Sequence, residues 1–433
     1  MLEAMTENSS IEDAFDFIEH RPTNGGQVRL GTRELFNYQV AKIIEEHLNI
    51  DVDDKRITHR EITSTVEQIL IDIKEDQIEN ELTDDIVSEF NKRKGEALSQ
   101  LLSSDLDQYT LIFPLNLGLI ESAIGELAAL EGDFQRIDQN KWVNDYFEVA
   151  KSEDDTFFKE FLDVSPNDFL SNRFAYYQIQ YKARSYGYAL SRVQDLANLA
   201  VGKLNYCLHQ RSRSRPRPTS DSALPYETWA ALKEPAFYLI FKDGKYQFSR
   251  PMDYGYRRNV KTSKEREQEA QEFYSLPLLS ENDPVDADLI NAILAYQDGL
   301  TEISKRKSFF SFWRGIENLS QIDSPKSEIK DRCRFGLEYV RGEDAVFPTL
   351  EKAHEEIDEI RNSLAHEGVH IFVGEDHRNY AKVLLDGMIE LYIQERGRFD
   401  RNDFDIFLEY GVEYQKSAGK IISMLRQSGF DID

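Results

Sequence analysis

The chain has 433 residues, of which 40% are hydrophobic, 30% are charged and 12% are aromatic. This composition can build sizeable cores and excludes wholesale disorder, and the length suggests two to four domains at roughly 150 residues each. No stretch approaches the ~18 consecutive apolar residues of a membrane span, and the acidic N-terminus lacks the plan of a signal peptide. The two cysteines are too few for a disulfide framework or a Cys-based zinc cluster. We therefore expect a cytoplasmic protein without membrane contact.

The net charge of −27 is distributed unevenly along the chain. Residues 1–150 carry 32 acidic and 13 basic side chains, whereas residues 201–250 carry 4 acidic and 9 basic ones. Such acidity argues against a general nucleic-acid coat protein, because phosphates are repelled. A polyanion would therefore meet the second half of the chain. An adaptation of the surface to high salt is an equally open interpretation of the acidity.

The first third of the chain predicts an acidic helical region over residues 1–105. Residues 1–30 contain Asn24-Gly25-Gly26 and little periodicity, which indicates a loose or partly ordered lead-in. Residues 32–104 follow a helical pattern, shown by the apolar side chains at positions 66, 69, 70 and 73. Thr83-Asp84-Asp85 is typical of an N-terminal cap, and predicts a helix that ends near Ser104.

Residues 106–280 predict a mixed α/β middle domain. Tyr109–Leu115 indicates a buried strand, and further strands are expected up to Trp142, although residues 120–130 fit a helix equally well. The tyrosine-rich residues 167–210 are expected to form a long helix or a helical pair. An Arg-rich linker at 211–220 follows, and then a hairpin turning at Asp243-Gly244.

The last third predicts an all-α bundle over residues 281–433, which makes the fold class α+β. Apolar residues recur at helical spacing in successive segments with short connections, as expected of antiparallel helices. The expected helices are 286–305, 308–322, 325–341, 348–366, 376–397 and 402–426.

One of these helices carries Arg361, Asn362 and His366. Its core stripe consists of apolar residues at positions 350, 353, 357, 360 and 364, so Asn362 and His366 fall on the opposite face and Arg361 at the boundary. A histidine there is either idle in solvent or faces a partner or substrate. Arg361 and His366 are about 140° apart around the helix, so their convergence requires the long reach of the arginine or a second subunit.

The segment Arg361-Asn362-Ser-Leu-Ala-His366 resembles the Arg-x(4–6)-His motif of HEPN ribonuclease domains. Upstream, the segment from Phe309 through Trp313 to Glu317 resembles the aromatic-Trp-x-x-(Leu/Ile)-Glu helix of the Apea-like HEPN branch. The resemblance covers residues 286–430. It implies a prokaryotic anti-phage defence protein whose helical bundle forms a homodimer with one composite cleft.

The resemblance also implies a chemistry. HEPN nucleases cleave RNA without a metal or other cofactor, by attack of the ribose 2′-hydroxyl on the adjacent phosphate. His366 would move the proton, and Arg361 would stabilise the charge that builds on the phosphate. Asn362 would orient the histidine or contact the substrate. Glu317 would hold Arg361 in place or contribute to the cleft, and its other interpretation is a solvated carboxylate.

Several cations are candidates for holding the phosphates of an RNA substrate, which could include tRNA. A first group is the arginine run in the linker, which could track an RNA backbone, be a flexible surface linker or contact the acidic N-terminal third of the chain. Its members are Arg211, Arg213, Arg215 and Arg217. A second group lies nearer the motif and consists of Lys305, Lys307, Arg314, Arg332 and Arg334. A metal site at His366, His370 and His377 is rejected, since no carboxylate pattern completes it.

Two hypotheses about function follow. In the first, the chain is an endoribonuclease restrained by its N-terminal regions until a phage-derived or host trigger acts, so deleting residues 1–105 should raise RNase activity. In the second, the bundle is a non-catalytic scaffold, or a module that dimerises and binds nucleotides or RNA. The nuclease hypothesis predicts that Arg361, Asn362 and His366 line a cleft at the bundle interface. The scaffold hypothesis predicts that they are scattered, or that they form salt bridges with Glu355, Glu359 or Glu367.

Overall fold

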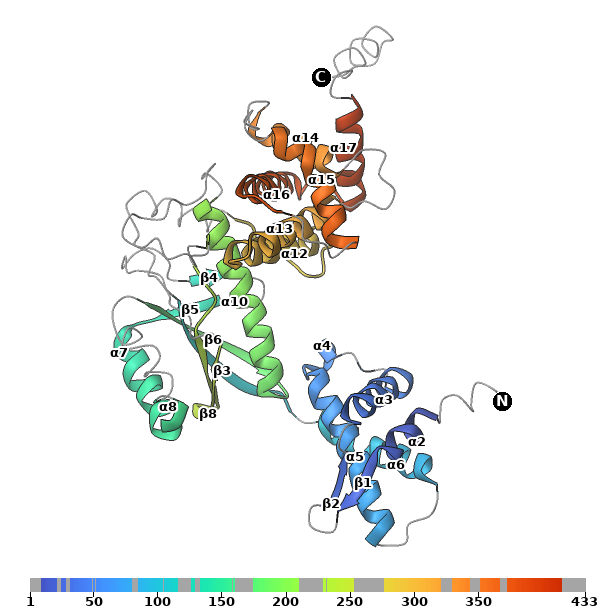
Figure 1. Ribbon diagram of the computed structural model, residues 1–433. Coiled ribbons are helices and arrows are strands. Elements are labelled where there is room, and N and C mark those ends of the chain that lie inside the picture. The colour runs from blue at the N-terminus through green and yellow to red at the C-terminus, as the bar shows by residue number, and fades with distance from the viewer. Residues whose placement is uncertain are drawn as a thin grey trace. The chain divides into compact units, whose positions relative to one another are not determined.

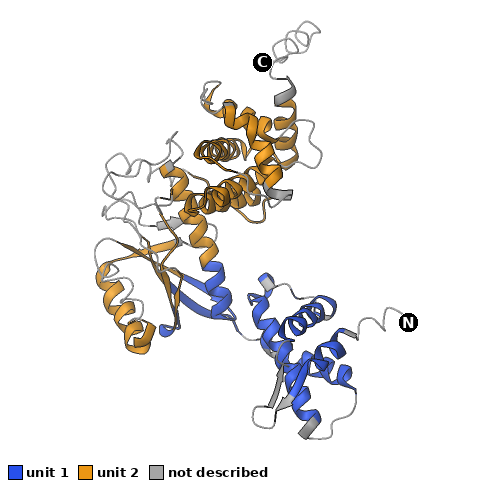
Figure 2. Cartoon of the chain, in the orientation of Figure 1, with its two compact units in different colours: residues 1–111, 180–193, 240–247 blue, residues 112–179, 194–239, 248–433 orange. Residues whose placement is uncertain are grey.

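The computed structural model is a mixed α/β protein of α+β type (Figure 1). The chain forms two compact units (Figure 2), which are residues 1–111, 180–193 and 240–247, and residues 112–179, 194–239 and 248–433. Within the described residues, no helix is long and apolar enough to cross a membrane. The structure describes residues 9–21, 25–28, 32–48, 50, 52–79, 85–103, 105–115, 126–128, 133–157, 159, 174–209, 229–230, 232–252, 276–320, 329–342, 351–366 and 372–414.

The first unit contains a helical core built from the N-terminal third of the chain. The two longest helices are α5 (His59–Glu79) and α6 (Ile86–Ser103), and both bury apolar side chains in one cluster. The expected stripe is confirmed, because Val66, Ile69, Leu70 and Ile73 are all at most 5% exposed. The other helices are α2 (Ser9–Asp16), α3 (Arg33–His47) and α4 (Val52–Lys55).

Side-chain caps fix where these helices begin. Asp85 accepts a hydrogen bond from the backbone N–H of Ser88 at 2.9 Å, which confirms the predicted cap of α6. Thr58 and Glu61 form a capping box ahead of α5. The Glu61 carboxylate accepts from the backbone N–H of Thr58 at 2.8 Å, and the Thr58 hydroxyl accepts from that of Glu61 at 3.2 Å.

The described part of residues 1–30 is more regular than the predicted loose or partly ordered lead-in. Ser9–Asp16 is helix α2, and β1 (Ile18–Arg21) pairs antiparallel with β2 (Gly25–Val28). The helix forms because Ile11, Ala14 and Phe15 lie on one face and are at most 2% exposed. The N-terminal region therefore contains a small sheet beside its helices.

A six-stranded sheet has the order β4-β5-β6-β3-β7-β8. Aromatic packing holds it together, with the Phe113 ring centroid 5.3 Å from those of Phe134 and Tyr238 and the Trp142 ring stacked on Tyr176 at 4.7 Å. Residues 126–128, left open between strand and helix, are a strand. The strands are β3 (Asp107–Leu115), β4 (Glu126–Ala128), β5 (Asp133–Ile137), β6 (Ala175–Ala183), β7 (Phe237–Lys242) and β8 (Lys245–Pro251).

The predicted hairpin is confirmed, and part of the predicted long helix is wrong. Asp243 and Gly244 connect β7 to β8 with φ values of 50° and 77°, as the Asp-Gly turn requires. Residues 175–183 form strand β6 rather than helix, because their tyrosines fit a sheet with both faces partly covered. The helical prediction holds for α10 (Tyr186–His209).

In the described part of the C-terminal bundle there are six helices, close to the predicted segments. They are α12 (Pro284–Thr301), α13 (Lys305–Ser320), α14 (Ile329–Arg341), α15 (Glu351–His366), α16 (Glu375–Glu395) and α17 (Arg401–Tyr414). Close crossings need glycine at several positions, of which Gly299 and Gly387 are two. A Cβ on Gly299 would lie 2.4 Å from the Phe312 ring, and one on Gly387 would lie 2.7 Å from the Leu337 side chain.

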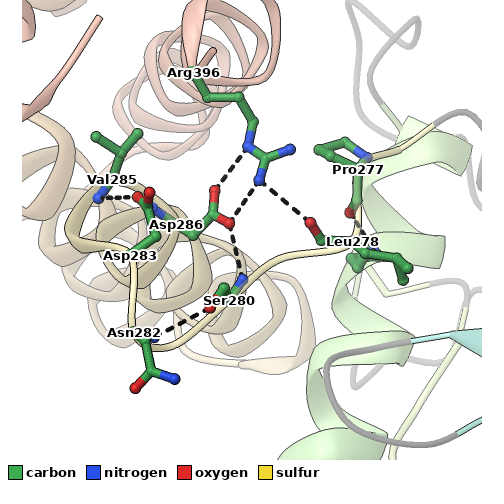
Figure 3. A network of polar contacts seen from close by, with 9 residues as sticks. Pro277, Leu278, Ser280, Asn282, Asp283, Val285, Asp286 and Arg396 are labelled. Carbon is green, nitrogen blue, oxygen red and sulfur yellow. Dashed lines mark hydrogen bonds and ion pairs between the residues drawn. The ribbon is translucent and has the colours of Figure 1, made fainter.

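A polar network ties the end of α16 to the start of α12 (Figure 3). Arg396 donates from Nε and Nη2 to the Asp286 carboxylate at 2.7 and 2.6 Å, and from Nη2 to the backbone carbonyl of Leu278 at 3.3 Å. Asp283 caps α12 by accepting from the backbone N–H of Val285 at 2.9 Å. The bidentate pair fixes the register of the two helices.

Lys203 on α10 gives a pH-dependent prediction for stability. It is 2% exposed and donates to the carbonyl of Pro277 at 3.1 Å, and burial lowers its pKa from 10.5 to about 8. Between about pH 8 and pH 10.5 the lysine is protonated in the unfolded chain and neutral in the folded chain. The free energy of unfolding therefore rises with pH over this range. Lys203→Met should therefore raise the free energy of unfolding at pH 7 by about 1 kcal/mol. Urea titrations from pH 7 to 10.5 should show this gain shrinking, and a gain independent of pH would contradict the assignment.

Candidate functional site

Helices α13 and α15 bring the motif residues of the two distant segments together. Helix α13 buries Phe309, Phe312 and Trp313, each at most 1% exposed. Helix α15 buries the predicted stripe at Ala353, Ile357 and Ile360, each at most 5% exposed. Leu350 lies outside the described residues, and of Leu364 only the backbone is described. These buried faces orient Glu317 of one helix toward Arg361 of the other.

Glu317 is the centre of the site. Its Oε1 accepts from Arg361 Nε at 3.0 Å, from Arg361 Nη2 at 2.6 Å and from Trp313 Nε1 at 3.0 Å. The Glu317 and Arg361 side chains are 35% and 31% exposed, so the pair lies at the surface of the bundle. The interpretation of Glu317 as a free solvated carboxylate is therefore wrong, because its carboxylate anchors the arginine.

Arg361 keeps part of its hydrogen-bonding capacity. A guanidinium has five N–H donors, and Nη1 also donates to Asn362 Oδ1 at 3.0 Å. Within the described contacts, one N–H on Nη1 and one on Nη2 remain without an acceptor. Such a pair matches two oxygens of a phosphate. The described contacts of Arg361 do not include Glu355 or Glu359, two of the three partners named for the scaffold hypothesis, and Glu367 lies outside the described residues.

Histidines fasten helix α15 to its neighbours. His354 contacts Tyr380 Oη through Nδ1 at 2.7 Å and Asp331 Oδ1 through Nε2 at 3.1 Å. His377 Nε2 contacts Glu356 Oε2 at 2.8 Å. The hydrogen bond from His354 lowers the pKa of Asp331, and the one from His377 lowers that of Glu356. These contacts hold the helix that carries Arg361.

His366 is the last residue of α15, and its side chain lies outside the described residues. The predicted helix therefore persists through all five steps from Arg361 to His366. At 3.6 residues per turn the two positions differ by about 140° around the axis. His377, once considered with His366 and His370 for a metal site, is bonded to Glu356.

The cations predicted to hold RNA are placed differently from one another. Lys305, Lys307 and Arg314 are exposed on α13, where Lys305 pairs with Glu375 at 3.3 Å and Arg314 with Asp298 at 2.5 Å. Arg334 pairs with Glu338 on its own helix at 2.8 Å. The arginine run of the linker at 211, 213, 215 and 217 lies outside the described residues.

Arg332 is not a surface cation, which corrects the prediction that it holds a phosphate. It is 1% exposed and donates to Asp405 at 2.8 Å and to Glu409. Its Nη1 also donates to the backbone carbonyl of Ser320 at 3.3 Å. A buried cation is stable only when it is paired in this way, so Arg332 is part of the bundle interior.

Trp313 is a site residue whose role the sequence prediction missed. Its indole N–H donates to Glu317, four residues later on the same helix, at 3.0 Å, and its ring stacks on Phe309 with centroids 6.1 Å apart. The i, i+4 spacing of a tryptophan and a glutamate was visible in the sequence. The indole thus fixes the carboxylate that in turn fixes Arg361.

Under the nuclease hypothesis, Trp313→Phe should lower kcat/KM for RNA cleavage by about tenfold, equivalent to ~1.4 kcal/mol, because one hydrogen bond to the charged Glu317 is lost. Phe309→Leu is the matched control. It removes the stacked ring but keeps the indole N–H, so it should lower the melting temperature and leave kcat/KM unchanged. An equal loss of kcat/KM in both variants would show that only packing matters.

Comparison of the chain with protein-family models found no matching family, and comparisons with curated proteins and with solved structures found no similar protein.

Proposed function

We propose that the chain is a metal-independent endoribonuclease of the HEPN type that acts as a homodimer in anti-phage defence. The observation that carries the proposal is the contact of Arg361 with Glu317, since it holds a guanidinium on the helix of His366 and leaves two N–H donors. In this proposal the C-terminal bundle is the nuclease, and the acidic N-terminal region and the mixed middle domain regulate it.

The proposed reaction uses groups of the RNA and of the protein. The 2′-hydroxyl oxygen attacks the adjacent phosphorus while His366 accepts its proton, and the bond from phosphorus to the 5′-oxygen breaks. The leaving 5′-oxygen takes a proton from water, which gives a 2′,3′-cyclic phosphate and a 5′-hydroxyl. The two unused donors of Arg361 bond the phosphoryl oxygens where negative charge builds. Asn362 Oδ1 limits the rotation of the guanidinium by accepting from Nη1.

The helical separation of Arg361 and His366 supports a composite site. About 140° on one helix is too wide for both side chains to meet one phosphate easily. Pairing two α15 helices across a dimer would place Arg361 of one subunit near His366 of the other. Mixing inactive Arg361→Ala and His366→Ala chains, and allowing subunits to exchange, should therefore restore part of the cleavage activity. No restoration in confirmed mixed dimers would argue that each subunit holds a complete site.

The alternative is a non-catalytic scaffold in which the Arg361–Glu317 pair only joins α13 to α15. Expression in bacterial cells separates the two functions. If the chain is a nuclease, the wild-type form should arrest growth when its trigger is present or when it is expressed at a high level. The His366→Ala variant should not arrest growth. Equal growth of the two strains, at equal protein levels, would contradict catalysis.

A further inference from the structure

Helix α13 has an exposed stripe that the packing of the bundle does not explain. Lys307, Phe310 and Arg314 are spaced i, i+3 and i+7, and all three are exposed. Phe310 is 46% exposed, whereas Phe309, Phe312 and Trp313 on the same helix are at most 1% exposed. The helix therefore packs against the bundle through the apolar side chains of its other face, and the packing does not require Phe310. We call these three residues the α13 stripe.

The α13 stripe leads to the site. Glu317 follows Lys307 by ten residues, or about 15 Å along the axis, and lies on the same side of the helix. Glu317 bonds Arg361 at 2.6 Å. One end of an extended ligand bound along the stripe would therefore lie next to the guanidinium of Arg361. Neither Lys307 nor Arg306 has an ion-pair partner among the described contacts.

The positive charges of the stripe do not stabilise helix α13. Lys305, Arg306 and Lys307 occupy its first turn, which contains no acidic residue. Cations at that end oppose the helix dipole and each cost about 0.3–1 kcal/mol. Arg314 pairs with Asp298, but both side chains are about half exposed, at 52% and 49%. Such pairs contribute ~0–1 kcal/mol, so a phosphate can compete for this arginine.

We propose that the α13 stripe binds single-stranded RNA, with a base stacked on Phe310 and the flanking phosphates held by Lys307 and Arg314. This inference rests on the proposed function, because it names the substrate class of that site. An exposed phenyl ring between two cations provides both parts of a single-strand site, a stacking surface and backbone neutralisation. A duplex keeps its bases stacked internally and cannot offer a free base face, so single strands or loops are selected.

The test measures binding separately from cleavage. The full-length His366→Ala chain is titrated into a short single-stranded RNA that contains 2-aminopurine, whose fluorescence falls when the base stacks. Phe310→Leu in this background should raise Kd about tenfold, equivalent to ~1.4 kcal/mol, and abolish the fluorescence change. Phe310→Trp should keep both. Lys307→Ala and Arg314→Ala should weaken binding and each reduce the salt dependence by about one ion.

Two controls make the outcomes decisive. Tyr410→Leu alters an aromatic on α17 that is similarly exposed, at 42%, and should bind as the parent does. The mass in solution of each variant is also measured. Unchanged binding by Phe310→Leu, equal affinity for a duplex, or a shift of that variant from dimer to monomer would overturn the inference. Stacking on Phe310 together with equal growth of the wild-type and His366→Ala strains would support this inference and count against the nuclease. Cleavage of single-stranded RNA that Phe310→Leu leaves unchanged would overturn this inference alone.

Discussion

Arg361→Lys is expected to lower kcat/KM for RNA cleavage by about 100-fold or more while the melting temperature changes little. Lysine keeps the charge but lacks the planar fork, so it cannot bond Glu317 and a phosphate together. Removing one preorganised donor from an oxyanion costs ~2.7–4 kcal/mol of transition-state stabilisation. The pair with Glu317 is about one-third exposed, so its contribution to folding is ~0–1 kcal/mol.

Glu317→Gln is the companion variant for this prediction. The amide oxygen still accepts from Trp313 and Arg361, but the charge that holds the guanidinium is lost. We expect about a tenfold loss of kcat/KM, equivalent to ~1.4 kcal/mol. Steady-state kinetics with thermal unfolding of the same samples measures both effects. Full activity in Arg361→Lys, or a collapse of its melting temperature, would show that the pair is structural.

Arg332→Ala is expected to have the largest effect on stability. Arg332 is 1% exposed and paired with Asp405 and Glu409, and Glu409 is itself 9% exposed. Removing the arginine leaves a carboxylate in the bundle interior without its counter-charge. The expected loss in the free energy of unfolding is about 3–5 kcal/mol, which chemical denaturation can measure.

Arg334→Ala is the matched control for this prediction. Arg334 pairs with Glu338 at i, i+4, where a surface pair contributes only about 0.3–0.5 kcal/mol. If Arg332 instead served at an RNA surface, its alanine variant would keep the wild-type melting temperature and bind RNA more weakly. That outcome would contradict the buried position of Arg332.

Short sequence patterns correctly predicted the helices and turns that depend only on residues close together in the chain. The six bundle helices follow from apolar side chains at helical spacing, and the β7–β8 turn follows from Asp243-Gly244. Strand β6 was missed because tyrosine suits a helix face as well as a sheet, and the neighbours that decide between them lie on other strands. Helix α2 was missed because its pattern spans only eight residues.

The features of the candidate site can also be separated into those with local causes and those that depend on distant residues. The core positions of α15 were readable from spacing, whereas the burial of Arg332 is decided by Asp405 and Glu409, which are 73 and 77 residues away. The contact of Glu317 with Arg361 spans 44 residues and was expected from the family resemblance alone. The proposed role of Phe310 could be inferred only from the exposure of its side chain. That exposure depends on how α13 packs, which the sequence does not reveal.

The most direct test of the nuclease is to incubate RNA with the wild-type chain and with His366→Ala in EDTA, at several salt concentrations, and to identify the new RNA ends. We predict 2′,3′-cyclic phosphate and 5′-hydroxyl ends with the wild-type chain, and no cleavage with His366→Ala. Cleavage that His366→Ala retains, that requires a divalent cation, or that leaves 3′-hydroxyl ends would contradict the proposed function.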